Sequence, residues 1–127
     1  TIRGDPMKLV DKVAMVTGSA RGIGRDISRR FSQEGAHVIV ADIDGEGARR
    51  VAAEIESNGA KAIPLELDVG DPGSVDAMFA AVLQRCGRID VRVNNAGIGS
   101  NQPVLAMALA EWNENLRINL TGTFLCA

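Results

Sequence analysis

Three glycines stand at the first, fifth and seventh positions of the segment 18–24, directly after the short apolar run Val13–Thr17. Gly18 can adopt backbone angles that are closed to other residues, and Gly22 and Gly24 put no side chain between the backbone and a ligand. A helix-like pattern begins within this turn. The first N–H groups of a helix are unpaired and carry a partial positive charge, and both properties suit a pyrophosphate. The segment therefore predicts a phosphate site, with an ordinary strand-to-helix turn as the alternative.

The spacing of the glycines separates the classes of nucleotide site. A P-loop would close with a lysine and a serine or threonine, whereas Gly24 is followed by Arg25 and Asp26. The more familiar dinucleotide pattern has glycines at the first, third and sixth positions. This turn is therefore neither a P-loop nor the common dinucleotide variant.

Asp42 closes a second apolar run, His37–Asp42, and lies 24 positions after Gly18. An acidic residue about 20 positions after such a turn accepts hydrogen bonds from the ribose of a dinucleotide. The alternative is a turn or helix-capping aspartate. The order of strand, turn, helix and strand before Asp42 favours the ribose role.

The elements that would position these residues alternate between strands and helices. Apolar runs predict strands at 13–17, 37–42, 61–67 and 89–93. Stripes of apolar residues predict four helices. Their apolar faces hold, in turn, Ile23, Ile27 and Phe31; Ala48, Val51, Ala52 and Ile55; Val75, Met78, Phe79, Val82 and Leu83; and Trp112, Leu116, Leu120 and Phe124.

Three β-to-α units in a row predict right-handed crossovers and a parallel sheet with the strand order 3-2-1-4. Pro64 places the third strand at an edge, because proline cannot donate to a ladder. A ligand is then expected at the carboxyl ends of strands 1 and 4, where the order reverses. The glycine turn and Asp42 both follow such strand ends.

The segment Asn94–Gly97 follows the fourth strand. Two buried amides, Asn94 and Asn95, are expected to tie neighbouring strands and a ligand together by hydrogen bonds. Ala96 and Gly97 leave room for a ribose. The alternative is a plain turn, since Asn and Gly are common turn residues.

The glycine motif from Thr17 to Gly24, together with Asn94-Asn95-Ala96-Gly97, resembles the short-chain dehydrogenase/reductase family. The resemblance runs from about Lys8 to Ala127. It implies an α/β fold of the Rossmann type, a doubly wound parallel sheet, and hydride transfer between NAD(P) and an alcohol or ketone. Within the family, the chain looks most like sugar-alcohol dehydrogenases and 3-oxoacyl carrier-protein reductases.

The resemblance also implies roles for individual residues. Asp68 and Val69 would lie beside the adenine ring, with a simple loop acid as the alternative for Asp68. Asn119 would be the one catalytic residue present, where it would hold a water in a proton relay. The alternative, on the residue pattern alone, is a structural amide whose hydrogen bonds are satisfied within the fold. The expected cofactor contacts are Gly18, Ser19, Arg21, Gly22, Ile23, Gly24, Asp42, Ile43, Asp68, Val69, Asn95, Ala96 and Gly97.

The choice of cofactor depends on two residues of opposite charge. The carboxylate of Asp42 would bind the 2′-hydroxyl of NAD and repel the 2′-phosphate of NADP. Arg21 favours NADP, since the resemblance associates a basic residue at this position with that cofactor, although it is also a plausible exposed loop residue. The direct repulsion at Asp42 decides the expectation in favour of NAD.

The Ser and Tyr-x-x-x-Lys that the resemblance implies are absent from the 127 residues, which contain no tyrosine. The chain ends within an apolar helical pattern, so we expect an N-terminal fragment: an incomplete Rossmann domain, 1–127, with a loose tail at 1–7. We expect no turnover by this chain as given. The alternatives are a non-catalytic nucleotide-binding module that ends at Ala127, and a gene remnant without a stable product.

Composition sets further limits. A net charge of −2 gives no reason to expect nucleic acid or an anionic membrane as a partner, and no apolar run approaches the roughly 20 residues of a membrane span. Cys86 and Cys126 lack the spacing of a metal site, so we expect no bound metal. We expect a cytoplasmic protein in which both thiols are reduced. The resemblance implies a homodimer or homotetramer for the full-length protein.

Overall fold

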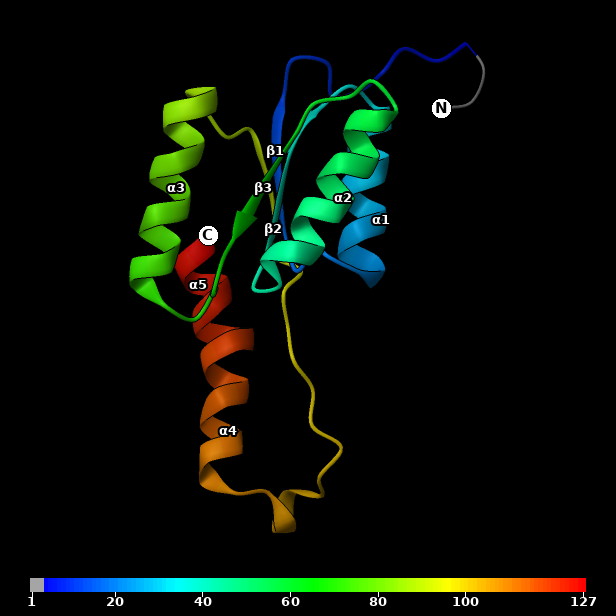
Figure 1. Ribbon diagram of the computed structural model, residues 1–127. Coiled ribbons are helices and arrows are strands. Elements are labelled where there is room, and N and C mark those ends of the chain that lie inside the picture. Colours follow the sequence, from blue (N-terminus) through cyan, green and yellow to red (C-terminus); the bar gives the residue numbers. More distant parts are fainter. Residues whose placement is uncertain (1–3) are drawn as a thin grey trace.

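The computed structural model describes residues 4–127 (Figure 1). Residues 1–3 of the predicted loose tail lie outside the described residues. Residues 4–7 are exposed and form neither helix nor strand.

Strands and helices alternate as the apolar patterns predict. The elements are β1 (Val13–Thr17), α1 (Gly22–Gln33), β2 (His37–Asp42), α2 (Gly45–Ser57), β3 (Ala62–Glu66), α3 (Pro72–Cys86) and β4 (Val91–Val93), then the 3₁₀ turn η1 (Val104–Ala106), α4 (Leu109–Leu116), the π-helical turn η2 (Arg117–Thr121) and α5 (Gly122–Cys126).

All strand pairs are parallel, and the order β3-β2-β1-β4 is the predicted one. The predicted doubly wound α/β fold is therefore confirmed. Pro64 lies in β3, at an edge of the sheet, as its missing N–H requires.

Helices cover both faces of the sheet: α1 and α2 lie on one side, and α3 and the C-terminal helix on the other (Figure 1). Successive residues of β1 serve opposite faces, so that Met15 packs in the core under α3 and Ala14 in the core under α2. Every residue of β1 is buried. This burial on both faces explains why the central strands are continuous apolar runs without polar alternation.

Three expectations about apolar residues are wrong in detail. Leu83, predicted on the apolar face of α3, is 51% exposed, because this helix buries Val75, Met78 and Val82. Ile23 is 73% exposed, because α1 buries the small residues Gly24 and Ser28 instead. The fourth strand begins at Val91 and not at residue 89. At its start the Asp90 carboxylate, in place of a backbone carbonyl, accepts the N–H of Val13 at 2.8 Å.

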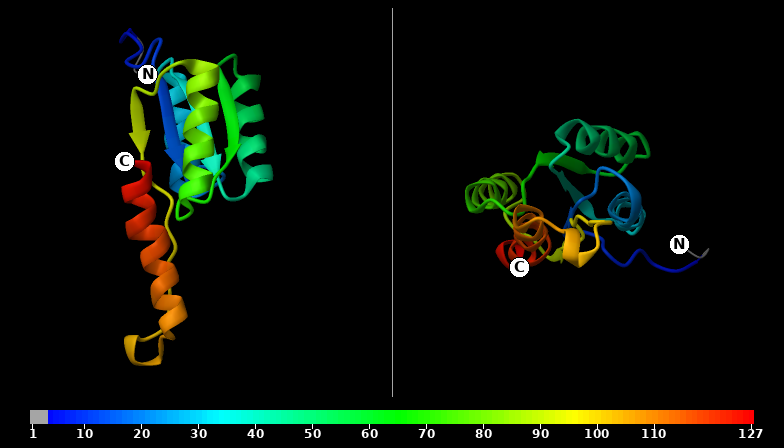
Figure 2. Two further views of the ribbon diagram at one scale, coloured as in Figure 1. Left: turned by 90° about the vertical axis from the view of Figure 1, so that its left-hand side faces the viewer. Right: turned by 90° about the horizontal axis from the view of Figure 1, so that it is seen from below.

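The last helix is not the single regular helix that the sequence predicts. The π turn η2 separates α4 from α5, and the predicted stripe of Trp112, Leu116, Leu120 and Phe124 lies on the exposed face. The buried face carries Ile118, Gly122 and Cys126. Figure 2 shows that α4 extends beyond the carboxyl ends of the strands. Within residues 4–127, no helix combines the length and the apolar character that a membrane crossing needs.

Candidate functional site

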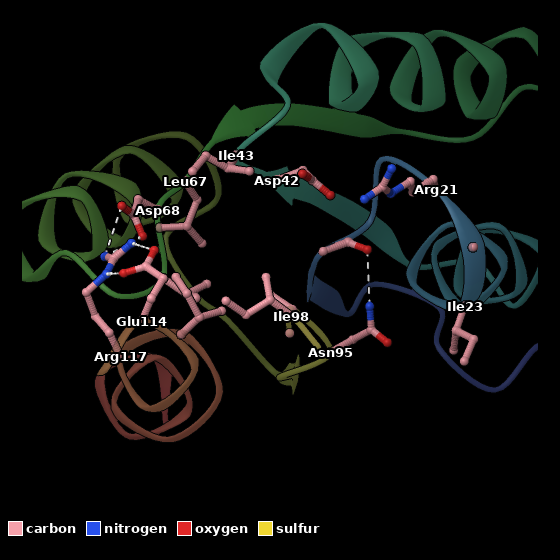
Figure 3. Close-up of a pocket in the computed structure, with 16 residues that line it drawn as sticks. Arg21, Ile23, Asp42, Ile43, Leu67, Asp68, Asn95, Ile98, Glu114 and Arg117 are labelled. Carbon is pink, nitrogen blue, oxygen red and sulfur yellow. Dashed lines mark hydrogen bonds and ion pairs between the residues drawn. The ribbon is translucent and has the colours of Figure 1, made fainter. Parts of the chain in front are cut away.

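A cavity of about 430 Å³ opens at the carboxyl ends of the strands (Figure 3). Its walls come from the turn after β1, the ends of β2 and β3, the loop after β4, and the segment that joins α4 to η2. This is the position at which the strand order reverses, and open α/β sheets bind their ligands there.

The glycine turn approaches the loop after β4 too closely for side chains. Gly18 has a φ of +66°, and a Cβ on it would lie 2.8 Å from the Cα of Ala96. A Cβ on Gly24 would lie 2.2 Å from the carbonyl oxygen of Gly18. Gly22 has a φ of +56°, and among residues 4–127 no atom outside its chain neighbours and its own helix backbone lies within 4 Å of its Cβ position, so this part of the turn is open to a ligand.

Helix α1 begins at this cavity without a side-chain cap. Among the residues that the structure describes, no side chain accepts a hydrogen bond at its N-cap, Arg21, and the first turn of α1 contains no acidic residue. In contrast, α2 and α3 are capped by Asp44 and Asp71, which accept the N–H groups of Gly47 and Ser74. The first turn of α1 is therefore free to interact with an anion.

The carboxylate of Asp42 is held in a fixed orientation at the cavity wall. Its Oδ2 accepts the N–H of Ala20 and its Oδ1 accepts the N–H of Asp44, both at 2.9 Å. Each oxygen retains acceptor capacity for a ligand hydroxyl. The end of β2 is thereby joined to the glycine turn.

Asn95 joins the ends of β1 and β4. Its Nδ2 donates to the carbonyl oxygens of Thr17 and Gly18, both at 3.1 Å. The Thr17 hydroxyl oxygen accepts the N–H groups of Asn95 at 3.1 Å and of Ala96 at 3.0 Å. The expectation that Asn94 is a second buried amide is wrong: Asn94 is exposed, and Asn95 alone has the predicted role, because successive residues point to opposite sides of the chain.

An ion-pair network lies at the end of the cavity that is opposite the glycine turn (Figure 3). Arg117 Nη1 lies 3.1 Å from both carboxylate oxygens of Asp68. Its Nε and Nη2 donate to Glu114 at 2.8 and 2.9 Å. Hydrogen bonds to Glu114 and Asp68 raise the pKa of the Arg117 guanidinium, and the Arg117 guanidinium lowers the pKa of Glu114.

Asn119 lies in the π turn η2 and binds the backbone of Ile98. Its Nδ2 donates to the Ile98 carbonyl and its Oδ1 accepts the Ile98 N–H, both at 2.8 Å. A Cβ on Gly97 would lie 3.2 Å from Asn119 Oδ1. Asn119 thus fixes the loop after β4, next to the cavity.

The predicted cofactor residues converge on this cavity. All of them line it except Ser19 and Gly24. Ser19 is fully buried, and its Oγ lies 2.9 Å from the carbonyl oxygen of Val16 and 3.2 Å from that of Ala41. Its hydroxyl therefore forms hydrogen bonds to backbone carbonyls in the core. Asn119 is beside the cavity and not among its lining residues.

Five further residues line the cavity that the sequence patterns do not predict: Leu67, Ile98, Glu114, Arg117 and Ile118. The helical spacing of Glu114 and Arg117 indicates an ion pair. Nothing local to either residue indicates that Asp68, 49 positions before Arg117, joins them.

Comparison with known proteins decides the family. Residues 12–127 match the family model described as short chain dehydrogenase.

The chain belongs to the short-chain dehydrogenase family.

The resemblance noted from the glycine and Asn-Asn-Ala-Gly motifs is thereby confirmed. Among relatives, the chain is 40% identical to the D-threitol dehydrogenase of Mycolicibacterium smegmatis, over 93% of this chain and 45% of that protein. It is 39% identical to a 3-oxoacyl-[acyl-carrier-protein] reductase of Thermotoga maritima, over 93% of this chain and 48% of that protein.

A solved structure agrees with the fold. The short-chain type dehydrogenase/reductase from Mycobacterium marinum superposes with a TM-score of 0.91 at 38% identity, covering 96% of this chain and 48% of that one. The chain thus spans about half the length of the relatives that it matches.

Proposed function

We propose that this chain binds NAD in the cavity at the carboxyl ends of its strands and is the cofactor-binding part of an oxidoreductase. That enzyme would transfer a hydride between the nicotinamide and an alcohol or ketone. The observation that carries the proposal is the meeting of two features in one cavity: the open glycine turn at the uncapped start of α1, and the oriented Asp42 carboxylate.

The donor set fits a dinucleotide. Gly22 and the first turn of α1 would hold the pyrophosphate, because unpaired N–H groups and the helix dipole both favour a phosphate. Asp42 would accept hydrogen bonds from the adenosine ribose, and Asp68 and Val69 would lie at the base. Bound there, the nicotinamide would supply the hydride chemistry of the reaction.

We favour NAD over NADP. The Asp42 carboxylate is fixed by Ala20 and Asp44, so it cannot readily turn away from a 2′-phosphate. Arg21 also lines the cavity, and in the part of the chain that the structure describes it forms no ion pair. Arg21 would favour NADP, but one flexible cation does not cancel the repulsion by a carboxylate held in place.

The names of two relatives support a substrate class. A D-threitol dehydrogenase and a 3-oxoacyl-[acyl-carrier-protein] reductase support a polyol or a 3-oxoacyl thioester as substrate. We infer a cytoplasmic enzyme that forms homodimers or homotetramers. Because the 127 residues contain no tyrosine, we infer that they do not turn over substrate by themselves, even with Asn119 as the proposed relay residue.

The lack of tyrosine also supports a second candidate, a nucleotide-binding module without catalysis. Reading the coding DNA beyond Ala127 distinguishes the two. A continuing frame with a Ser and a Tyr-x-x-x-Lys supports the enzyme, whereas a stop codon supports the module. Calorimetric titration of the product of the complete reading frame with NAD and NADP then tests cofactor binding, which both candidates require.

A further inference from the structure

The base-binding end of the cavity depends on an arginine that comes from a distant part of the chain. Arg117, in η2, reaches across to the loop between β3 and α3 and holds the carboxylate of Asp68 (Figure 3). Its Nη1 lies 3.1 Å from both oxygens of that carboxylate. The bonds join the C-terminal helical segment to the loop after β3 at one end of the cavity.

The shape of the guanidinium is needed for this contact. Its Nε and Nη2 donate to Glu114 while its Nη1 donates to Asp68, so one planar group serves two carboxylates in different directions. Glu114 orients the guanidinium, and the guanidinium in turn orients Asp68. A lysine carries the charge but lacks the fork.

Gly70 provides the space in which Arg117 lies. A Cβ on Gly70 would be 2.5 Å from Nη1, 2.9 Å from Cγ and 3.0 Å from Cζ of Arg117. The arginine side chain therefore passes directly over this backbone. Gly70 does not have a positive φ, so its backbone conformation alone does not require glycine.

The hydrogen bonds leave one oxygen of Asp68 available. Oδ1 accepts both the N–H of Gly70 and Nη1 of Arg117, whereas Oδ2 accepts, among the described residues, from Arg117 alone. Asp68 lines the cavity, and a carboxylate oxygen can accept a further hydrogen bond there. An acceptor held in place favours a base that presents an amino group, such as adenine, over one that presents a carbonyl.

We propose that Arg117 is a positioning residue that holds the Asp68 carboxylate as the acceptor for the amino group of the cofactor's base and so sets the preference for adenine. The proposal rests on the proposed binding of NAD in this cavity. Arg117 does not contact the base itself; it acts through Asp68.

The experiment compares NAD with nicotinamide hypoxanthine dinucleotide, in which a carbonyl replaces the amino group of the adenine. Both are titrated into the product of the complete reading frame. We expect the wild type to bind NAD at least about tenfold more tightly, as one charge-assisted hydrogen bond allows. Arg117→Met should reduce this ratio to about two, mainly by weakening NAD binding.

Further variants separate positioning from general stability. Gly70→Ala keeps the charge of Arg117 but displaces its guanidinium, and should lower the ratio in the same direction. Arg117→Lys should give an affinity ratio between those of Arg117→Met and the wild type. Asp68→Asn should remove the discrimination, and adding Arg117→Met to Asp68→Asn should change the ratio no further. Arg85→Met, an exposed arginine in the last turn of α3, is the matched control and should bind as the wild type.

Each outcome decides a different claim. If the wild type binds neither dinucleotide, the proposed function fails. If it binds NAD but Arg117→Met keeps the wild-type ratio, or weakens both ligands equally, the positioning role fails and NAD binding stands. If Arg117→Met does not fold, the ratios of Gly70→Ala and Arg117→Lys decide in the same way.

Discussion

Thr17 and Asn95 fasten the first and fourth strands to each other at the cavity. The Thr17 hydroxyl oxygen accepts the N–H of Asn95, and the Asn95 side-chain amide donates back to the Thr17 carbonyl, both at 3.1 Å. The residues are 78 positions apart in the chain. The glycine turn and the loop after β4 are therefore built as one unit.

Removing the Thr17 hydroxyl tests this unit. Thr17→Val keeps the shape but leaves the N–H groups of Asn95 and Ala96 without their acceptor. We expect the free energy of unfolding to fall by about 1–3 kcal/mol, because partly buried donors left without an acceptor are costly. Urea denaturation measures the change. Thr121→Val, at an exposed threonine, is the control, and an equal loss in both variants would contradict the account.

The close approach at Gly24 gives a second test. An added Cβ would lie 2.2 Å from the backbone oxygen of Gly18, which cannot move without distorting the turn. We expect Gly24→Ala to cost about 3 kcal/mol, at the upper end of overpacking effects. Gly73→Ala, where the nearest atom lies at 3.8 Å, should be neutral or slightly stabilising. Thermal unfolding distinguishes the two, and similar melting temperatures would count against this packing.

The sequence predicted the order of the strands and most of the cavity lining, because those features follow from local patterns. Apolar runs and glycines fix each strand and turn, and parallel topology brings the strand ends together. Ser19 illustrates the limit: its place in the motif suggested a ligand contact, whereas its hydroxyl points to the core carbonyls of Val16 and Ala41. A motif gives the backbone path but not the direction of every side chain.

The role of Arg117 could not be predicted for a different reason. Its partner Asp68 is distant in the chain, and the two meet only because η2 packs against the loop after β3. The π turn itself was also missed, since the apolar spacing of the segment 112–124 is compatible with a regular helix. Close packing of Gly122 on Val69, where a Cβ would lie 2.6 Å from Cγ2, holds the segment there.

Asp42 should set the preference between the two nicotinamide cofactors. In Asp42→Ala the ribose loses its charged acceptor and a 2′-phosphate is no longer repelled. We expect NAD to bind about tenfold more weakly, as the loss of one hydrogen bond to a charged group predicts, while NADP binding improves. Titration of both cofactors gives the ratio. Asp76→Ala, at an exposed aspartate of α3, is the control. An unchanged NAD-to-NADP ratio in Asp42→Ala would refute this role.

The hydrogen bonds of Asp90, which directly precedes β4, predict that acid lowers the stability of the fold. Hydrogen bonds from Arg88 and from the Val13 N–H lower the pKa of Asp90 in the folded chain. The folded state then binds fewer protons than the unfolded state near the ordinary pKa of about 3.9, so the stabilisation is complete above that pH and is lost as the pH falls through the folded-state pKa. We expect Asp90→Asn to be less stable than the wild type at pH 7, with the difference shrinking towards pH 2. A difference that stays constant in urea denaturation at both pH values would contradict this assignment.

The most direct test of the account is a calorimetric titration of NAD and NADP into the product of the complete reading frame. We expect one NAD site per chain, with a Kd between about 1 μM and 1 mM, the range that typical KM values span, and weaker binding of NADP. Absence of binding of either cofactor at millimolar concentration would contradict the central claim that the cavity at the carboxyl ends of the strands is a dinucleotide site.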